Sequence, residues 1–322
     1  MNLIEPRRWV AVNVSLFIDK LDVLRLRKHF RKIKYWFHAI KYRKFLNKNI
    51  KLKDIHLGKK FIVMGTGVSL LELDVKSPKN AITFGCNEIF QFAGIDKINL
   101  NYYVVGEPFY GRILGKKYID DINEYYSEVE SVFSNDKTSF LFHATIAEYF
   151  KKTGTLKNKV KNYYVSKCKI QESSVHEHEL SKPITFCDGA IFVMISASIF
   201  LGAKEIYLLG CGYTFSPIQL LHFYDAIAHP EGIHNQERDV FLEQTKRKYS
   251  DCIISKSITR DGIQYYNLTK DMNEDNYEKY RIIKNYAEGL GVKIINVIPV
   301  PHKSPVFESI TIEKFNSISS AW

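Results

Sequence analysis

An α/β fold with a mostly parallel sheet flanked by helices is the fold class that the sequence predicts, on three observations. Short apolar runs rich in Ile, Val, Phe and Tyr recur between residues 59 and 299, and stretches of helical length lie between several of them. Strands that alternate with helices are typical of βαβ units, whose strands run parallel. Three of the runs have a glycine at or near their end, namely Gly65, Gly106 and Gly210, as expected where a strand turns tightly.

Seven runs are predicted as strands and three longer stretches as helices. The strands are expected at 61–65, 81–87, 101–108, 139–143, 162–166, 205–212 and 292–299. The helices are expected at 111–131, 187–202 and 274–290. Because ligands of parallel sheets sit beyond the carboxyl ends of the strands, the residues directly after each run are the candidates for a site.

Composition is typical of a globular protein. The chain has 322 residues, enough for one large domain or two small ones, and 45% of them are hydrophobic. Its five cysteines are scattered and form no C-x-x-C pair, which argues against a zinc site or a disulfide framework and for a reducing compartment. No apolar run approaches the roughly 18 residues of a membrane-spanning helix, and the charges near the N-terminus are poorly placed for a cleavable signal.

Positive charge is concentrated near the N-terminus. The net charge is +11, but residues 1–60 hold 17 Lys and Arg against 4 Asp and Glu, and the other 262 residues hold 29 against 31. A basic arm, residues 1–58, is therefore distinct from a nearly neutral body at 59–310, with 311–322 as a C-terminal tail. A nearly neutral body lacks the excess of positive charge that is typical of nucleic-acid-binding domains, so we expect no nucleic-acid partner.

The arm contains a predicted amphipathic helix. One apolar face is formed by side chains that recur in steps of three and four, namely Leu26, Phe30, Ile33, Phe37 and Ile40. Lys and Arg fill most of the remaining positions. Such a helix can lie in an anionic membrane surface, which is the interpretation we favour. Packing of the stripe on the body, contact within an oligomer and RNA binding are the alternatives.

The turn after the first run is a candidate phosphate site. It holds Gly65, Thr66, Gly67 and Ser69, and glycines there let a backbone approach a ligand while the following helix N-terminus favours an anion. The dinucleotide fingerprint would need a small residue at position 70, where this chain has Leu70. Many α/β proteins have such a turn without any ligand.

Polar residues follow the next two runs. Asn87 ends the second run, where an amide can bind a base or sugar or can cap the next helix. Glu107 follows the third run, as a ligand contact or as an ordinary loop carboxylate.

The stretch 185–215 is the strongest local unit. A turn containing Asp188 and Gly189 opens a helix of small and apolar residues, and Ser196 to Ser198 allow close packing, so we expect this helix to be buried. The next strand leads into a segment rich in His, Tyr and Asp, namely Tyr213, His222, Tyr224, Asp225, His229 and His234. Such groups are candidates for acid–base or anion-binding roles, with surface-loop histidines as the alternative. The H-E-x-x-H and H-x-x-E-H patterns are absent, so no metal is expected.

Taken in order, GTGVSL, FGCNEIF, CDGA and LGAKEIYLLGCGY resemble motifs of the bacterial sialyltransferases of glycosyltransferase family 42. The closing stretch from Asn296 to Glu308 is similar to a wider group that includes nonulosonate transferases and pterin pyrophosphokinase-like proteins. The resemblance covers roughly residues 59–310 and leaves the arm outside. It implies a Rossmann-like nucleotide-binding domain of a GT-A-like variant, with a lid around 213–270.

The resemblance also implies an activity and residue roles. The activity is transfer of a nonulosonic acid from a CMP-activated donor to a glycan or lipid-linked glycan acceptor, with inversion, without metal and without another cofactor. The nucleotide contacts would be Gly65, Thr66, Gly67, Ser69, Asn87, Glu107, Asp188 and Gly189. Tyr213 and Tyr224 would hold the departing phosphate, and a histidine would be the general base.

Three positions depart from the family pattern. Thr66 stands where the sialyltransferases have asparagine, and Gly212 stands where an aspartate is usual. The stretch before the last helix, NLTKDMNEDN, lacks the family's histidine, so His222 is our substitute for the base. These departures keep two alternatives open, a transferase of the same fold that uses ATP and magnesium, and a non-catalytic binding protein. The expected location is cytoplasmic, peripheral on the inner membrane, and a homo-oligomer is an open possibility.

Overall fold

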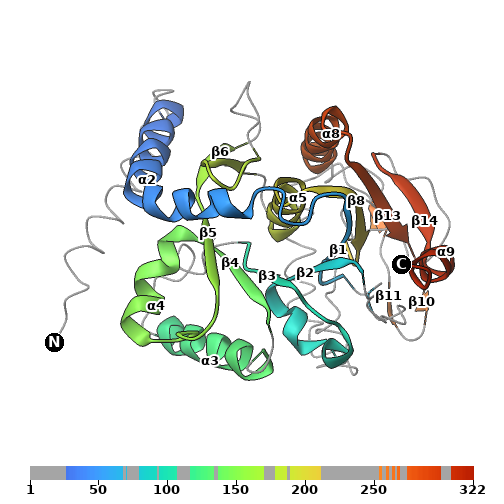
Figure 1. Ribbon diagram of the computed structural model, residues 1–322, viewed down its shortest axis with the longest axis horizontal. Coiled ribbons are helices and arrows are strands. Elements are labelled where there is room, and N and C mark those ends of the chain that lie inside the picture. The colour runs from blue at the N-terminus through green and yellow to red at the C-terminus, as the bar shows by residue number, and fades with distance from the viewer. Residues whose placement is uncertain are drawn as a thin grey trace.

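The computed structural model describes residues 27–67, 70, 80–92, 94–106, 117–133, 137–169, 178–186, 189–211, 254–255, 259–260, 263–264, 267–268, 274–298 and 306–322. Its centre is an eight-stranded sheet in which every paired neighbour runs parallel (Figure 1). The expected α/β fold is confirmed, with a main sheet that is wholly parallel.

The strand order contains one reversal. Across the sheet the strands are β14 (Glu308–Thr311), β13 (Lys293–Ile298), β8 (Ala203–Leu209), β1 (Lys59–Met64), β2 (Ile82–Cys86), β3 (Tyr102–Val104), β4 (Ser139–His143) and β5 (Lys161–Tyr164). All seven predicted strands are among them. The chain moves outward from β1 to β5 and then returns to β8, on the other side of β1. The carboxyl ends of β1 and β8 therefore flank the topological switch point, where sheets of this class bind ligands.

Helices cover both faces of the sheet. The predicted helices are confirmed as α3 (Lys117–Val132), α5 (Ala190–Phe200) and α8 (Glu274–Gly289), and the structure adds α4 (Ala147–Thr153) and α9 (Ile312–Ser319). Short 3₁₀ turns are η1 (Ile50–Leu52), η3 (Asn87–Gln91), η4 (Ile95–Lys97) and η6 (Ala144–Ile146). Small ladders join β6 (Ser166–Lys169) to β7 (Ile184–Phe186), β9 (Ile254–Ser255) to β12 (Asn267–Leu268), and β10 (Thr259–Arg260) to β11 (Ile263–Gln264). Of the lid predicted around 213–270, the structure describes only the four strands β9 to β12.

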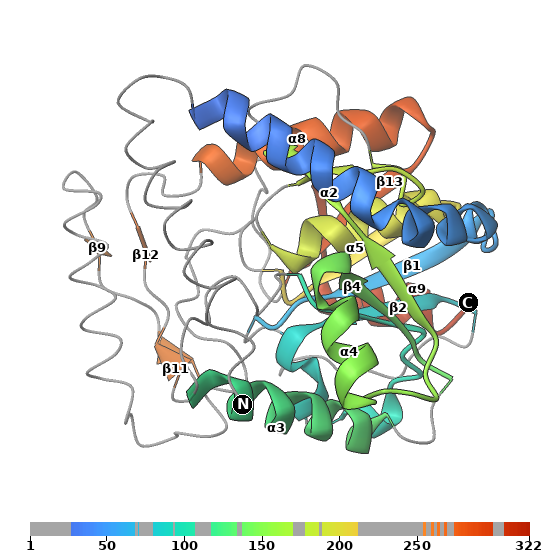
Figure 2. The same ribbon diagram turned by 90° about the vertical axis from the view of Figure 1, so that its left-hand side faces the viewer.

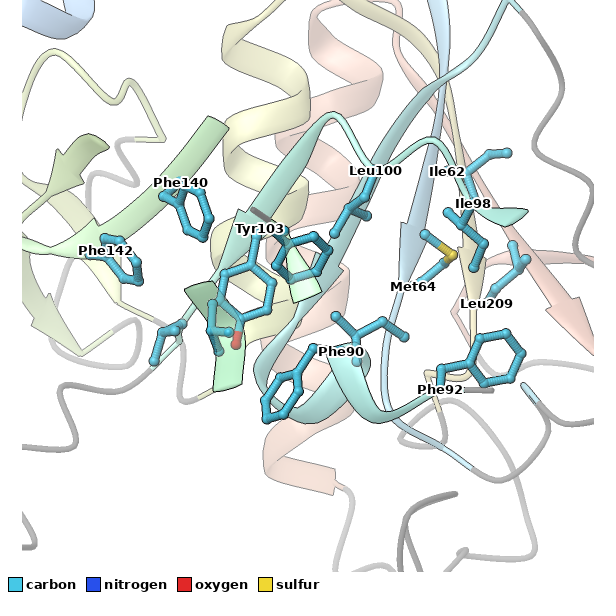
Figure 3. Packing of buried hydrophobic residues seen from close by; sticks show 14 of the residues in the cluster. Ile62, Met64, Phe90, Phe92, Ile98, Leu100, Tyr103, Phe140, Phe142 and Leu209 are labelled. Atoms are coloured by element: carbon cyan, nitrogen blue, oxygen red, sulfur yellow. The ribbon is translucent and has the colours of Figure 1, made fainter. Parts of the chain in front are cut away.

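Side chains of successive strand residues enter two separate cores. In β1, Ile62 and Met64 pack on the face that carries α3, α4 and α9, and Figure 3 shows them beside Ile98 and Leu209. Phe61 and Val63 point to the other face, where every residue of α5 is buried. Because both faces are covered, the strands read as continuous apolar runs instead of alternating ones. The expected burial of the helix at 187–202 is confirmed.

The arm helix α2 (Arg27–Asn49) contacts β5 and β6 through its C-terminal half. Tyr42 and Leu46 are buried in the core, and the amide nitrogen of Asn49 donates to the carbonyls of Tyr163 at 2.7 Å and Leu180 at 2.8 Å. In both views α2 lies on the outside of the molecule (Figures 1 and 2). This half of the arm is packed on the body.

The C-terminal residues are also packed. Phe315 of α9 is buried, and the ring of Trp322 lies 4.9 Å from the ring of Tyr207 in β8. Among the described residues, no helix combines the length and the apolar composition that crossing a bilayer requires.

Candidate functional site

The turn after β1 lies directly against the end of β8. The Gly65 N–H donates to the Leu209 carbonyl at 2.7 Å, and the Gly67 N–H donates to the Gly210 carbonyl at 2.8 Å. A Cβ added at Gly65 would lie 2.5 Å from the Gly210 carbonyl oxygen and 3.0 Å from the Ile191 side chain. Glycine is required at position 65 because the two backbones meet there.

The N-terminus of α5 opens at the same edge of the sheet. The helix is joined to β8 through Leu201 and Gly202, so it runs opposite to that strand and begins near the strand's carboxyl end. Gly189 precedes it with φ 115° and ψ 149°, a backbone conformation essentially confined to glycine. Gly189 has no side chain that could cap this helix start. The first N–H groups of a helix have no partner within the helix and favour an anion, so this end is suited to a phosphate.

The end of β3 completes the cluster. A Cβ added at Gly106 would lie 2.4 Å from both the Cα and the N of Ala190, the first residue of α5. The Tyr164 hydroxyl, from the end of β5, donates to the Gly106 carbonyl at 2.7 Å. The end of β3 is therefore held between α5 and β5.

Asn87 connects the end of β2 to this cluster. Its backbone has φ 48°, a left-handed conformation that asparagine tolerates better than most residues. Its Oδ1 accepts the Gly106 N–H at 3.3 Å, and its carbonyl accepts the Tyr103 hydroxyl at 2.7 Å. The side chain is half-buried, and within the described part of the chain its Nδ2 donates no hydrogen bond. With the amide oriented by Gly106, Nδ2 is the group that this residue can offer to a ligand.

The structure thus brings together five of the residues singled out from the sequence, namely Gly65, Thr66, Gly67, Asn87 and Gly189. Thr66 is buried between the two glycines of the turn. Leu70 is fully buried in the core and its N–H donates to the Gly67 carbonyl at 3.0 Å, so its size serves packing. The remaining predicted site residues lie outside the described residues: Ser69, Glu107, Asp188, Tyr213, His222 and Tyr224.

Two tyrosines that support the cluster were not predicted. Tyr164 positions Gly106, and Tyr103 positions Asn87 while its hydroxyl also meets that of Tyr125 at 2.8 Å. Burial raises the pKa of the Tyr103 hydroxyl well above its usual value, with a smaller contribution from Tyr125. The hydroxyl stays protonated and therefore acts as a donor. Both tyrosines lie within apolar runs that the sequence predicts as strands. Because a buried phenol needs a hydrogen-bond partner, a tyrosine in such a run is the sequence feature that could have indicated these contacts.

His143 at the end of β4 is a further polar group near this cluster. Its Nδ1 pairs with the Thr145 hydroxyl at 2.8 Å, and its ring packs edge-on against that of Tyr164 with centroids 5.2 Å apart. Its Nδ1 also accepts the Thr145 N–H at 3.4 Å and so caps the short turn η6. These contacts give it a positioning role behind Tyr164.

Two buried thiols also lie at the carboxyl ends of strands. Burial raises the pKa of the Cys86 thiol well above its usual value, and it raises the pKa of Cys211 to about 12. A thiol must ionise to act as a nucleophile or a metal ligand, so neither cysteine is suited to such a role. Nowhere in the described ranges do three or more His, Cys, Asp or Glu residues gather as a metal would require.

Comparison with known proteins gives structural likeness at low sequence identity. No protein-family model matches the chain, and no curated protein sequence matches it. The MAf glycosyltransferase from Magnetospirillum magneticum AMB-1 aligns with a TM-score of 0.43 and 11% identity over 86% of this chain. The chain spans 41% of the length of that structure.

Two structures from Campylobacter jejuni align more weakly. The α-2,3-sialyltransferase in its apo form has a TM-score of 0.27 and 16% identity, over 72% of this chain and 95% of that one. The sialyltransferase CstII in complex with CMP-3FNeuAc has a TM-score of 0.25 and 17% identity, over 59% of this chain and 78% of that one. These similarities concern the course of the chain and transfer no residue roles to it.

Proposed function

We propose that the chain is a glycosyltransferase that moves a nonulosonic acid from a CMP-activated donor to a glycan acceptor. One observation carries the proposal. The glycine turn after β1, Asn87 after β2 and the start of α5 meet at the topological switch point of the sheet, in the order of the sialyltransferase-like motifs. An edge of this kind suits a nucleotide with a single phosphate.

Each part of the edge has a role in the proposal. The turn Gly65–Gly67 lets the backbone approach the phosphate, and the N–H groups at the start of α5 favour its negative charge. The Nδ2 of Asn87 donates to an acceptor on the cytosine or the ribose. Ser69, Glu107 and Asp188 add contacts around the donor. Leu70, which belongs to the core, is compatible with the proposal because the turn needs to hold only one nucleotide.

The proposed reaction breaks the bond between the sugar's anomeric carbon and the phosphate oxygen of CMP. The acceptor hydroxyl oxygen forms a new bond to that carbon from the opposite face, which inverts its configuration. His222 takes the hydroxyl proton, and CMP leaves with the electron pair of the broken bond. Tyr213 and Tyr224 donate hydrogen bonds to the departing phosphate, and loss of one such oriented donor costs roughly 2.7–4 kcal/mol.

The proposed acceptor is a glycan of the cell surface or its lipid-linked precursor, as in lipopolysaccharide or capsule synthesis. Such precursors are available at the cytoplasmic face of the inner membrane, which is where we place the reaction.

The experiment is an incubation of the purified chain with CMP-sialic acid, CMP-pseudaminic acid or CMP-Kdo and a glycosidic or lipid-linked acceptor. We expect release of CMP matched by transfer of the sugar, and loss of both in His222→Ala while CMP still binds. Failure of every donor to give transfer or CMP release would contradict the proposal.

A binding comparison separates the alternatives. We expect CMP to raise the thermal unfolding temperature more than ATP with magnesium does. A larger shift with ATP and magnesium would redirect the proposal to a phosphoryl- or pyrophosphoryl-transfer enzyme. Binding of CMP without turnover of any donor would indicate a binding protein.

A further inference from the structure

The predicted apolar stripe of the arm is exposed in its described part. Ile33, Phe37 and Ile40 are 49%, 59% and 53% exposed, and Trp36 beside them is 60% exposed. Large apolar side chains gathered over two turns of one helix are an unusual feature of a free surface. We call these four residues, with the cations that follow them, the outer face of α2.

Helix geometry places this stripe opposite to the side by which α2 packs. At about 100° per residue, positions 33, 36, 37 and 40 lie on one side of a helix and positions 42, 45, 46 and 49 lie about 180° away. The second set makes the packing contacts: Tyr42 and Leu46 are buried, and the Phe45 ring lies 4.7 Å from the ring of Tyr163. The described part of the body therefore packs on the other side of α2 and leaves the stripe exposed.

The outer face continues into positive charge. Lys41, Arg43, Lys44 and Lys48 are exposed over the next two turns, on or beside the side that carries the stripe. Lys41 forms an ion pair with Glu148 at 3.2 Å, and exposed pairs of this kind contribute little to stability. The helix as a whole contains nine Lys and Arg and no Asp or Glu. The outer face thus presents apolar and cationic side chains together.

The helix is firmly attached to the body. Besides the two hydrogen bonds of Asn49, the segment that follows is held by backbone bonds from Asp54 to Phe200, from His56 to Leu201 and from Gly58 to Gly202, at 3.1, 2.9 and 2.8 Å. A surface that engages the outer face would therefore hold the body in a defined orientation.

We propose that the outer face of α2 docks the chain on an anionic lipid bilayer surface. The apolar side chains enter the boundary between headgroups and acyl chains, and the cations meet the negative headgroups. A second copy of the chain is a poorer occupant, because two such faces would bring like charges together. The inference goes beyond the proposed reaction and does not depend on the donor or the acceptor.

The test is cosedimentation of the full chain with vesicles of phosphatidylcholine alone or of phosphatidylcholine mixed with phosphatidylglycerol. We expect binding to the anionic vesicles and release by salt. The variant Trp36→Gln/Phe37→Gln should lose this binding. The matched control Val160→Gln/Leu290→Gln removes two other exposed apolar side chains and should bind as the wild type does. Lys44→Ala and Lys48→Ala should each weaken binding roughly fivefold, since each cation adds a similar increment near the surface.

Three results would overturn the inference. One is absence of binding to anionic vesicles, and another is an equal loss in the control variant. The third is a wild-type dimer in sedimentation that becomes monomeric in Trp36→Gln/Phe37→Gln without any vesicle binding, which would make the outer face a contact between copies. Circular dichroism confirms that each variant is folded, and since the substituted side chains are exposed, no loss of folding is expected.

Discussion

The carboxyl edge of the sheet and the outer face of α2 are built in opposite ways. At the edge, backbones meet so closely that a single added carbon at Gly65 or Gly106 would lie within 2.5 Å of another backbone. On the outer face, Trp36 and Phe37 are more than half exposed. The edge depends on main-chain shape and should not tolerate substitution, whereas the outer face depends on side-chain chemistry and should tolerate it without unfolding. The four predictions that follow test this contrast, from the largest expected effect to the smallest.

The largest effect is expected for Gly106→Ala. The new methyl group would lie 2.4 Å from the backbone of Ala190, so β3 or α5 must move. We expect the free energy of unfolding to fall by about 3 kcal/mol, measured by urea denaturation. Gly289→Ala is the control, because a Cβ there would meet nothing within 4 Å, and it should change stability by less than about 1 kcal/mol. Equal stability of the two variants would contradict the close backbone contact between Gly106 and Ala190.

A smaller loss is expected on the inner side of α2. Asn49→Ala removes two donors from the carbonyls of Tyr163 and Leu180 in a fully buried position. Leaving buried carbonyls without donors costs about 2 kcal/mol. Asn47→Ala, two residues earlier at an exposed position of the same helix, should be nearly neutral. If Asn49→Ala were also neutral, α2 would not be held to the body as described.

Tyr164→Phe tests the support of Gly106. The variant keeps the ring and loses the hydroxyl that donates to the Gly106 carbonyl at 2.7 Å. We expect a loss of about 1 kcal/mol in unfolding free energy, together with weaker CMP binding because the edge is less well positioned. Tyr163→Phe in the same strand is the control for removing a phenol. Unchanged CMP affinity in Tyr164→Phe would show that the Tyr164 hydroxyl does not help to position the CMP site.

The smallest effect on stability is expected for the outer face. Trp36→Gln/Phe37→Gln replaces exposed side chains, so the free energy of unfolding, measured by urea denaturation, should change by no more than about 0.5 kcal/mol. Stability and vesicle binding should therefore respond independently. A loss comparable to that of Asn49→Ala would mean that these side chains support the fold.

Much of the fold could be predicted from local pattern. The seven strands follow from apolar runs such as 61–65 and 205–212, and burial of α5 follows from its small residues. The glycines and Asn87 could be placed at one edge because the ends of parallel strands meet there. Periodicity also predicted the stripe with Ile33, Phe37 and Ile40.

Other features depend on tertiary contacts that no local pattern contains. Periodicity relates residues of one helix to each other, but it does not say which side meets the body, so the opposite packing of Tyr42 and Leu46 was not predicted. The bond from Tyr164 to Gly106 joins residues 58 positions apart in the chain. For His222, Tyr213 and Tyr224, which lie outside the described residues, the assigned roles stay predictions.

The most direct test of the central claim is a crystal structure of the chain with CMP. We expect the phosphate beside the Gly65–Gly67 turn and the start of α5, with Asn87 Nδ2 donating to the cytosine or the ribose. CMP bound away from this edge, or no CMP in crystals at a concentration that saturates binding in solution, would contradict the account.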